Sequence, residues 1–120
     1  MRNFLVLLLL TACVNHEFPN NDVATAVDRA CKLCNKPISE MMWFAEIVRK
    51  ADSDPGLQGN IYKARIDDQV LFIHQPAIMS CVACVVYNCN GDRVSADPAL
   101  IEKIIPFFTT EHLLFSSFPN

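Results

Sequence analysis

The spacing of apolar residues predicts a helix soon after the polar stretch 14–21. Small or apolar residues recur every three or four positions, at Val23, Ala26, Val27 and Ala30, which is the period of one helix face. Asn21 or Asp22 lies where a capping side chain is needed. Pro37 stops the pattern, so this helix should end near Cys31–Cys34.

A second helix is predicted over residues 39–52. Apolar residues gather on one side of it, at Met41, Phe44, Val48 and Ala51 with Trp43 and Ile47 beside them. Charged residues fall mostly on the other side, at Glu40, Glu46, Arg49 and Lys50. Such a stripe is typical of a helix packed on a core. Asp54-Pro55-Gly56 then provides a stop and turn.

After Gly59 the pattern changes to the period of two that is typical of strands. Tyr62, Ala64 and Ile66 alternate with Lys63 and Arg65, and a β-branched and aromatic run continues to His74. Asp67-Asp68 separates the two runs. So short a polar link predicts an antiparallel hairpin.

The rest of the chain predicts further short elements. A third strand is expected over residues 84–89, followed by a turn at Asn90-Gly91 and a return strand from Arg93-Val94. Asp97-Pro98 has the cap and first residue of a helix, which should run to Pro106. The apolar cluster at residues 113–115 is a candidate last strand.

This order of elements predicts an α+β fold. N-terminal helices should pack on one face of a small antiparallel β-meander of three to five strands, with a short C-terminal helix and the candidate last strand. Trp43, Phe44 and Val48 should cover that face. We expect the other face to be largely open to solvent.

The N-terminus has the order of an export signal: Arg2, an apolar run and then small residues. Leu10-Thr11-Ala12-Cys13 resembles the lipobox of bacterial lipoproteins, which implies a signal peptide over residues 1–12 and diacylglycerol on Cys13. Residues 13–21 would be the tether and 22–120 a single domain. The alternatives are an ordinary signal peptide with a cysteine at the cut, or a buried N-terminal strand.

The predicted location is outside the cytoplasm, at a membrane to which the lipid on Cys13 anchors the protein. Val14 replaces the Asp that retains enteric lipoproteins at the inner membrane, so we expect the outer membrane, on its periplasmic or cell-surface side. Cleavage removes only Arg2 among charged residues and leaves 9 Lys and Arg against 13 Asp and Glu, a net charge of −4. No basic block is present, so a nucleic-acid partner is not expected.

Five cysteines follow Cys13 in the chain: Cys31, Cys34, Cys81, Cys84 and Cys89. Export favours disulfides, and five thiols allow 15 connectivities with one thiol left over. We expect one long-range bridge from Cys31 or Cys34 to the sheet. The alternatives are a zinc site of Cys31, Cys34, Cys81 and Cys84, and thiol-disulfide exchange at Cys31-Lys32-Leu33-Cys34.

Several motifs between residues 43 and 93 occur together: a Trp-containing helix, Gly59-Asn60-Ile61-Tyr62, Val70-Leu71-Phe72, Ser80-Cys81-Val82-Ala83-Cys84, and V-Y-x-C-x-G at 86–91. In this combination the segment resembles a family of small, uncharacterised extracytoplasmic domains of Bacteroidota lipoproteins. The loop cysteines of that family are often adjacent, whereas two residues separate them here. The resemblance implies a small extracytoplasmic domain anchored as a lipoprotein, and it implies no catalytic residue.

The sequence therefore predicts a non-enzymatic binding or scaffold domain of the cell envelope, with an envelope protein as a candidate partner. No Ser/His/Asp or Cys/His set has a spacing that demands catalysis, and acid pairs such as Asp67-Asp68 lie in predicted turns. Apart from the lipid, no cofactor is expected. The alternative function is a zinc-binding or redox domain based on the two C-x-x-C pairs.

Overall fold

The computed structural model describes residues 22–118. The predicted signal peptide, the predicted lipidation site Cys13 and the predicted tether lie outside this range. The helices are α2 (Val23–Cys34), α3 (Met42–Ser53) and α4 (Pro98–Ile104), with short 3₁₀ turns η2 (Ile38–Glu40), η3 (Ile105–Phe107) and η4 (Thr110–His112). The strands are β1 (Gly59–Ile66), β2 (Gln69–Pro76), β3 (Val86–Tyr87) and β4 (Leu113–Ser116).

The sheet is antiparallel throughout, in the order β3-β2-β1-β4. The predicted hairpin joins β1 to β2, with Gly59 opposite Pro76 and Ile66 opposite Gln69. Its turn residues, Asp67 and Asp68, have φ of 52° and 64°, the pattern of a two-residue turn that suits the strand twist. The α+β prediction and the last strand are confirmed.

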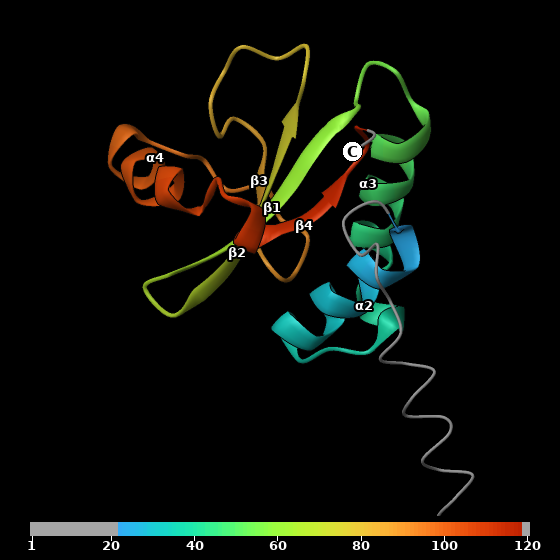
Figure 1. The fold of residues 1–120 in the computed structure, drawn as a ribbon. Helices are drawn as coiled ribbons and strands as arrows, with labels where there is room; N and C mark the ends of the chain where they lie inside the picture. The colour runs from blue at the N-terminus through green and yellow to red at the C-terminus, as the bar shows by residue number, and fades with distance from the viewer. Residues whose placement is uncertain (1–21, 119–120) are drawn as a thin grey trace, which may run out of the picture.

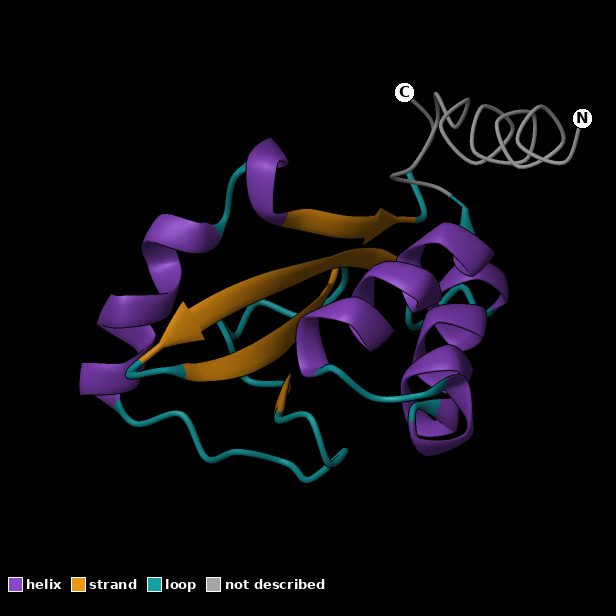
Figure 2. Ribbon diagram, turned by 90° about the horizontal axis from the view of Figure 1, so that it is seen from below, coloured by secondary structure: helices purple, strands orange, loops and turns teal. Residues whose placement is uncertain are grey.

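Helices α2 and α3 pack on one face of the sheet and α4 lies on the other (Figures 1 and 2). The first core joins both N-terminal helices to β1, β2 and β4 and contains the fully buried Met41, Phe44, Phe72 and Phe115. The predicted apolar face of residues 39–52 is confirmed, because Met41, Phe44, Val48 and Ala51 are all buried.

The expectation of an open second face is wrong. Leu71 and Ile73 of β2 point into a second core, where they pack with Val86 and with Ile104 of α4. The reason is visible in the run V-L-F-I, since four consecutive apolar residues place hydrophobic side chains on both sides of a strand. The sheet is therefore the middle layer of three (Figure 2).

Two predicted boundaries also differ. Ser39 does not open the second helix: residues 38–40 form η2, and α3 begins at Met42 without a side-chain cap. The 3₁₀ turn η2 ends directly before Met41, which is fully buried. The third strand spans two residues rather than 84–89. Ala83, with φ of 55°, interrupts extended backbone before it, and a turn in which Oδ1 of Asn88 accepts from the N–H of Asn90 ends it. Of the return strand, only a bridge between Arg93 and Tyr87 forms.

Candidate functional site

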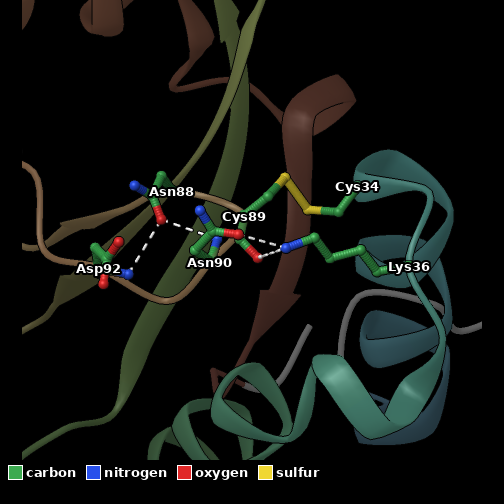
Figure 3. Close-up of a disulfide and its surroundings, with 6 residues drawn as sticks. All are labelled: Cys34, Lys36, Asn88, Cys89, Asn90 and Asp92. Atoms are coloured by element: carbon green, nitrogen blue, oxygen red, sulfur yellow. Dashed lines mark hydrogen bonds between the residues drawn. A yellow bond between two sulfur atoms is a disulfide. The ribbon is translucent and has the colours of Figure 1, made fainter.

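The long-range bridge expected from the N-terminal helix to the sheet is present between Cys34 and Cys89 (Figure 3). Their Cα atoms are 5.6 Å apart, and 55 residues separate them in the chain. Cys34 is the last residue of α2, and Asn35 closes the helix in the left-handed conformation with φ of 53°. The disulfide thus fastens α2 to the loop that follows β3.

Lys36 reinforces the same junction. Its Nζ donates to the carbonyl oxygen of Cys89 at 3.4 Å and to Oδ1 of Asn90 (Figure 3). The backbone N–H of Lys36 donates to the carbonyl of Cys31 at 3.0 Å, which fixes the chain as it leaves the helix. One covalent bond and one charged side chain therefore hold the same loop.

The loop after β3 is a compact turn built on Asn88. Its Oδ1 accepts from the N–H of Asn90 at 2.9 Å and from that of Asp92 at 3.1 Å. Gly91 has φ of 85°, and a Cβ there would lie 2.8 Å from Cγ of Trp43, so a glycine is required. The indole ring also contacts the rings of Phe44, Phe72 and Tyr87. The turn predicted at Asn90-Gly91 thus packs directly on the helix α3.

A second disulfide joins Cys81 to Cys84 within the loop between β2 and β3. The side chain of Gln75 holds this loop, since its Nε2 donates to the carbonyl of Cys81 and its Oε1 accepts from the N–H of Ala83, both at 3.0 Å. Arg93 donates to the carbonyl of Cys84 at 3.1 Å. The loop carries exposed Ile78, Met79 and Val82, and no charged residue occurs from 75 to 91.

We expect mild reductant to open Cys81–Cys84 before Cys34–Cys89. Cys81 is exposed, whereas Cys34 and Cys89 are partly buried, and access controls the rate of thiol attack on a disulfide. Differential alkylation during titration with dithiothreitol, followed by peptide mass spectrometry, measures the order. Simultaneous labelling of all four cysteines would contradict this expectation.

Cys31 is the remaining thiol of the described residues. Burial first, and the nearby Asp28 carboxylate second, raise the pKa of this thiol, so the reactive thiolate is disfavoured at neutral pH. Cys31 lies in a groove of about 850 Å³ between α2, η2 and α3, where Ile38 and Met42 are also exposed.

The structure does not bring the two C-x-x-C pairs into one cluster. Cys34 is bonded to Cys89, and Cys81 to Cys84. Over residues 22–118, no group of three or more His, Cys, Asp or Glu side chains is arranged to hold a metal ion. Cys31 and Cys34 lie at the C-terminal end of α2, away from the helix N-terminus that would lower a thiol pKa.

His74 is a buried titratable group on β2. Its Nε2 lies 2.8 Å from the carbonyl oxygen of Leu57, and because a carbonyl only accepts, the ring nitrogen donates. Burial lowers the pKa of His74 below its ordinary value of 6.5, and the hydrogen bond to Leu57 opposes this only in part. At neutral pH the folded protein therefore holds a neutral imidazole at this position.

We expect His74 to make the protein less stable in mild acid. Below about pH 6.5 the unfolded chain binds a proton that folded His74 takes up only at lower pH, so the free energy of unfolding falls as pH falls. His74→Gln keeps a donor for Leu57 without the titration. Urea unfolding at pH 7.5 and 5.5 should show a smaller pH effect in the variant. Equal pH effects in both proteins would contradict this assignment.

The sequence pattern did not predict a basic cleft that lies beside the C-terminal half of α2. Two adjoining hollows of about 370 and 170 Å³ share Leu33, Lys63 and Arg65. The larger is also lined by Arg29 and Lys32, with Glu111 as the acidic residue. These cations come from α2 and β1 and form no run in the chain. The one available signal was the alternation at 62–66, which places Lys63 and Arg65 on one side of a strand.

A comparison with protein-family models, curated proteins and solved structures finds no match in any of the three. Within residues 22–118, none of the helices is both long and apolar enough to cross a membrane.

Proposed function

We propose that this protein is a lipid-anchored extracytoplasmic domain that acts by binding rather than by catalysis. The observation that carries the proposal is the Cys34–Cys89 bridge, which joins α2 to the loop after β3. Structural disulfides persist in oxidising compartments outside the cytoplasm. A scaffold held in this way suits a domain that works in the cell envelope.

The anchor in this proposal is the lipid on Cys13, behind the export signal of residues 1–12. Two or more acyl chains hold a domain on a membrane without a spanning helix. The lipobox and the resemblance to Bacteroidota lipoprotein domains support an extracytoplasmic lipoprotein. Val14, in place of the Asp that retains enteric lipoproteins at the inner membrane, supports the outer membrane, with the domain on the periplasmic or cell-surface side. An envelope component is then the natural partner.

The anchor is tested by expressing the full chain and Cys13→Ser in a bacterium and partitioning each between detergent and aqueous phases. The native chain should enter the detergent phase with the mass of diacylglycerol on its N-terminal residue, and Cys13→Ser should lack that mass. The control Cys31→Ser should behave as the native chain. If the native chain lacked the mass of diacylglycerol, the proposed lipid anchor would be wrong.

A second candidate is redox or metal chemistry at the cysteines, and the exposed Cys81–Cys84 bridge is the observation that favours it. Intact mass after alkylation without reductant, with zinc assayed on the same sample, separates the scaffold from the metal centre. One alkylated thiol and no zinc supports the stable scaffold. Four protected thiols that a chelator releases, with about one zinc per chain, would replace the scaffold by a metal centre.

A further inference from the structure

The basic cleft gathers positive charge in an acidic chain. Residues 22–118 contain 9 Lys and Arg against 12 Asp and Glu. Four of the nine, Arg29, Lys32, Lys63 and Arg65, line the same cleft, with Glu111 as the opposing charge. Like charges repel, so a fold does not bring four cations together without a cost in stability. Glu111 in the cleft and Asp28 beside Lys32 balance only part of this positive charge, so an anionic ligand would be stabilised there.

Most cations elsewhere in the described chain have a role in the fold. Arg49 pairs with Glu46 at 3.1 Å and Lys103 with Asp67 at 3.2 Å. Lys36 and Arg93 hold the cysteine loops by hydrogen bonds. Lys50, the remaining one, lies exposed on α3.

Three of the four cleft cations differ from these. Lys32 pairs with Asp28 at 3.0 Å. Within residues 22–118, Arg29, Lys63 and Arg65 have neither an ion pair nor a side-chain hydrogen bond. Three cations are thus available to a ligand at one place.

The fold positions these side chains through the short pairing of β4. Strand β4 pairs with β1 only over residues 60–62, so the hairpin end of β1 is left without a partner on that edge. Lys63 and Arg65 are two residues apart and therefore project to the same side of the strand. The C-terminal half of α2 lies across from them with Arg29 and Lys32. The cations face a shared space from two elements.

The same cleft has an apolar wall. Leu33, Ala64, Val70 and Phe107 line the smaller hollow beside Lys63 and Arg65. His112 completes that wall, with Nδ1 within 2.8 Å of the Thr109 hydroxyl and its ring 4.8 Å from that of Phe107. A ligand that fits both parts has an anionic head and a short hydrocarbon portion, because guanidinium and ammonium groups bind phosphate or carboxylate while the wall favours carbon.

We propose that this cleft binds a small amphiphilic anion, with its phosphate or carboxylate group at Arg29, Lys63 and Arg65 and its hydrocarbon portion against Leu33 and Phe107. The inference rests on the proposed binding function and names the ligand class. It requires no change in the lipid anchor or in the disulfides, so the mass and partition assays above are independent of its outcome.

The test uses the full chain, kept in phosphatidylcholine nanodiscs, and titration calorimetry with three probes. Hexyl phosphate carries both the anion and the chain, inorganic phosphate carries the anion alone, and hexanol carries the chain alone. We expect saturable binding of hexyl phosphate, at least tenfold tighter than either other probe and weakened when NaCl rises from about 50 to 200 mM. Empty nanodiscs give the background of each probe.

The double variant Lys63→Gln/Arg65→Gln removes two cations of the cleft, and we expect at least tenfold weaker binding of hexyl phosphate. The matched control Arg49→Gln/Lys50→Gln removes the same charge from α3 and should bind within twofold of the native chain. Thermal unfolding of both variants verifies the fold. Equal loss in both variants would show nonspecific attraction and overturn the site. Equal affinity for hexyl phosphate and inorganic phosphate, or for hexyl phosphate and hexanol, would overturn the ligand class, and no binding would overturn both.

Discussion

Replacing Cys34 and Cys89 together by alanine is expected to lower the free energy of unfolding by about 4 kcal/mol, the value of the chain-entropy model for a loop of this length. The bridge closes a segment of 55 residues, so its removal returns much conformational freedom to the unfolded chain. That loss is a large share of the stability of a small domain. Chemical denaturation monitored by Trp43 fluorescence gives the value.

The matched control is Cys81→Ala/Cys84→Ala, which opens a bridge between residues only three apart. The same model gives about 2 kcal/mol for so short a loop. The ranking of the two double variants is therefore the informative result. A smaller effect for the long-range pair would mean that Lys36 and the packing of Gly91 on Trp43 hold the junction without the covalent bond.

Replacing Gly59 by alanine is expected to destabilise the protein by about 3 kcal/mol, the upper part of the usual range for overpacking. A Cβ at this position would overlap the carbonyl oxygen of Gln75 and lie 2.7 Å from Cα of Pro76. Both neighbours are backbone atoms of the paired strand β2. Ser117 also holds Gly59 from the other side, by hydrogen bonds of 2.9 and 3.0 Å, so β1 has little freedom to move away.

Gly56→Ala is the control for this substitution. The nearest atom to its added Cβ is Oδ1 of Asp54 at 3.5 Å, an ordinary contact. The unfolding free energy of this variant should stay within about 0.5 kcal/mol of the native value. If Gly59→Ala proved equally mild, the strand would have to shift, and circular dichroism together with amide exchange in β1 and β2 would detect the rearrangement.

Elements that depend on local pattern were predictable from the sequence. The face of α3 followed from the spacing of Phe44, Val48 and Ala51, all of which are buried. The start of α4 followed from Asp97, whose side chain accepts from the N–H of Leu100 at 2.8 Å. The hairpin followed from two alternating runs around Asp67-Asp68. In each case the chemistry that decides the structure lies within a few residues.

Features that depend on distant contacts were predicted in part or missed. A long bridge to the sheet was expected, but the choice between Cys31 and Cys34 depends on which one faces Cys89 after α2 packs. The run V-L-F-I indicates that β2 has two apolar faces, but it does not show that α4 returns across the sheet to cover the second one. The basic cleft joins residues of α2 and β1 that are about 30 positions apart. Such sites arise only from tertiary packing.

The position of Cys31, one helical turn before Cys34 on α2, also affects how the protein matures. At a synthesis rate of roughly 5–20 residues per second, the ribosome adds Cys34 about 3–11 s before Cys89, which lies 55 residues later. The first thiol that Cys34 meets is then Cys31. In a chain exported as proposed above, an oxidant that acts before Cys89 arrives would join this adjacent pair. The native bond would then form when the Cys89 thiolate attacks Sγ of Cys34 and releases the Cys31 thiolate. A disulfide isomerase would therefore raise the yield of the native protein.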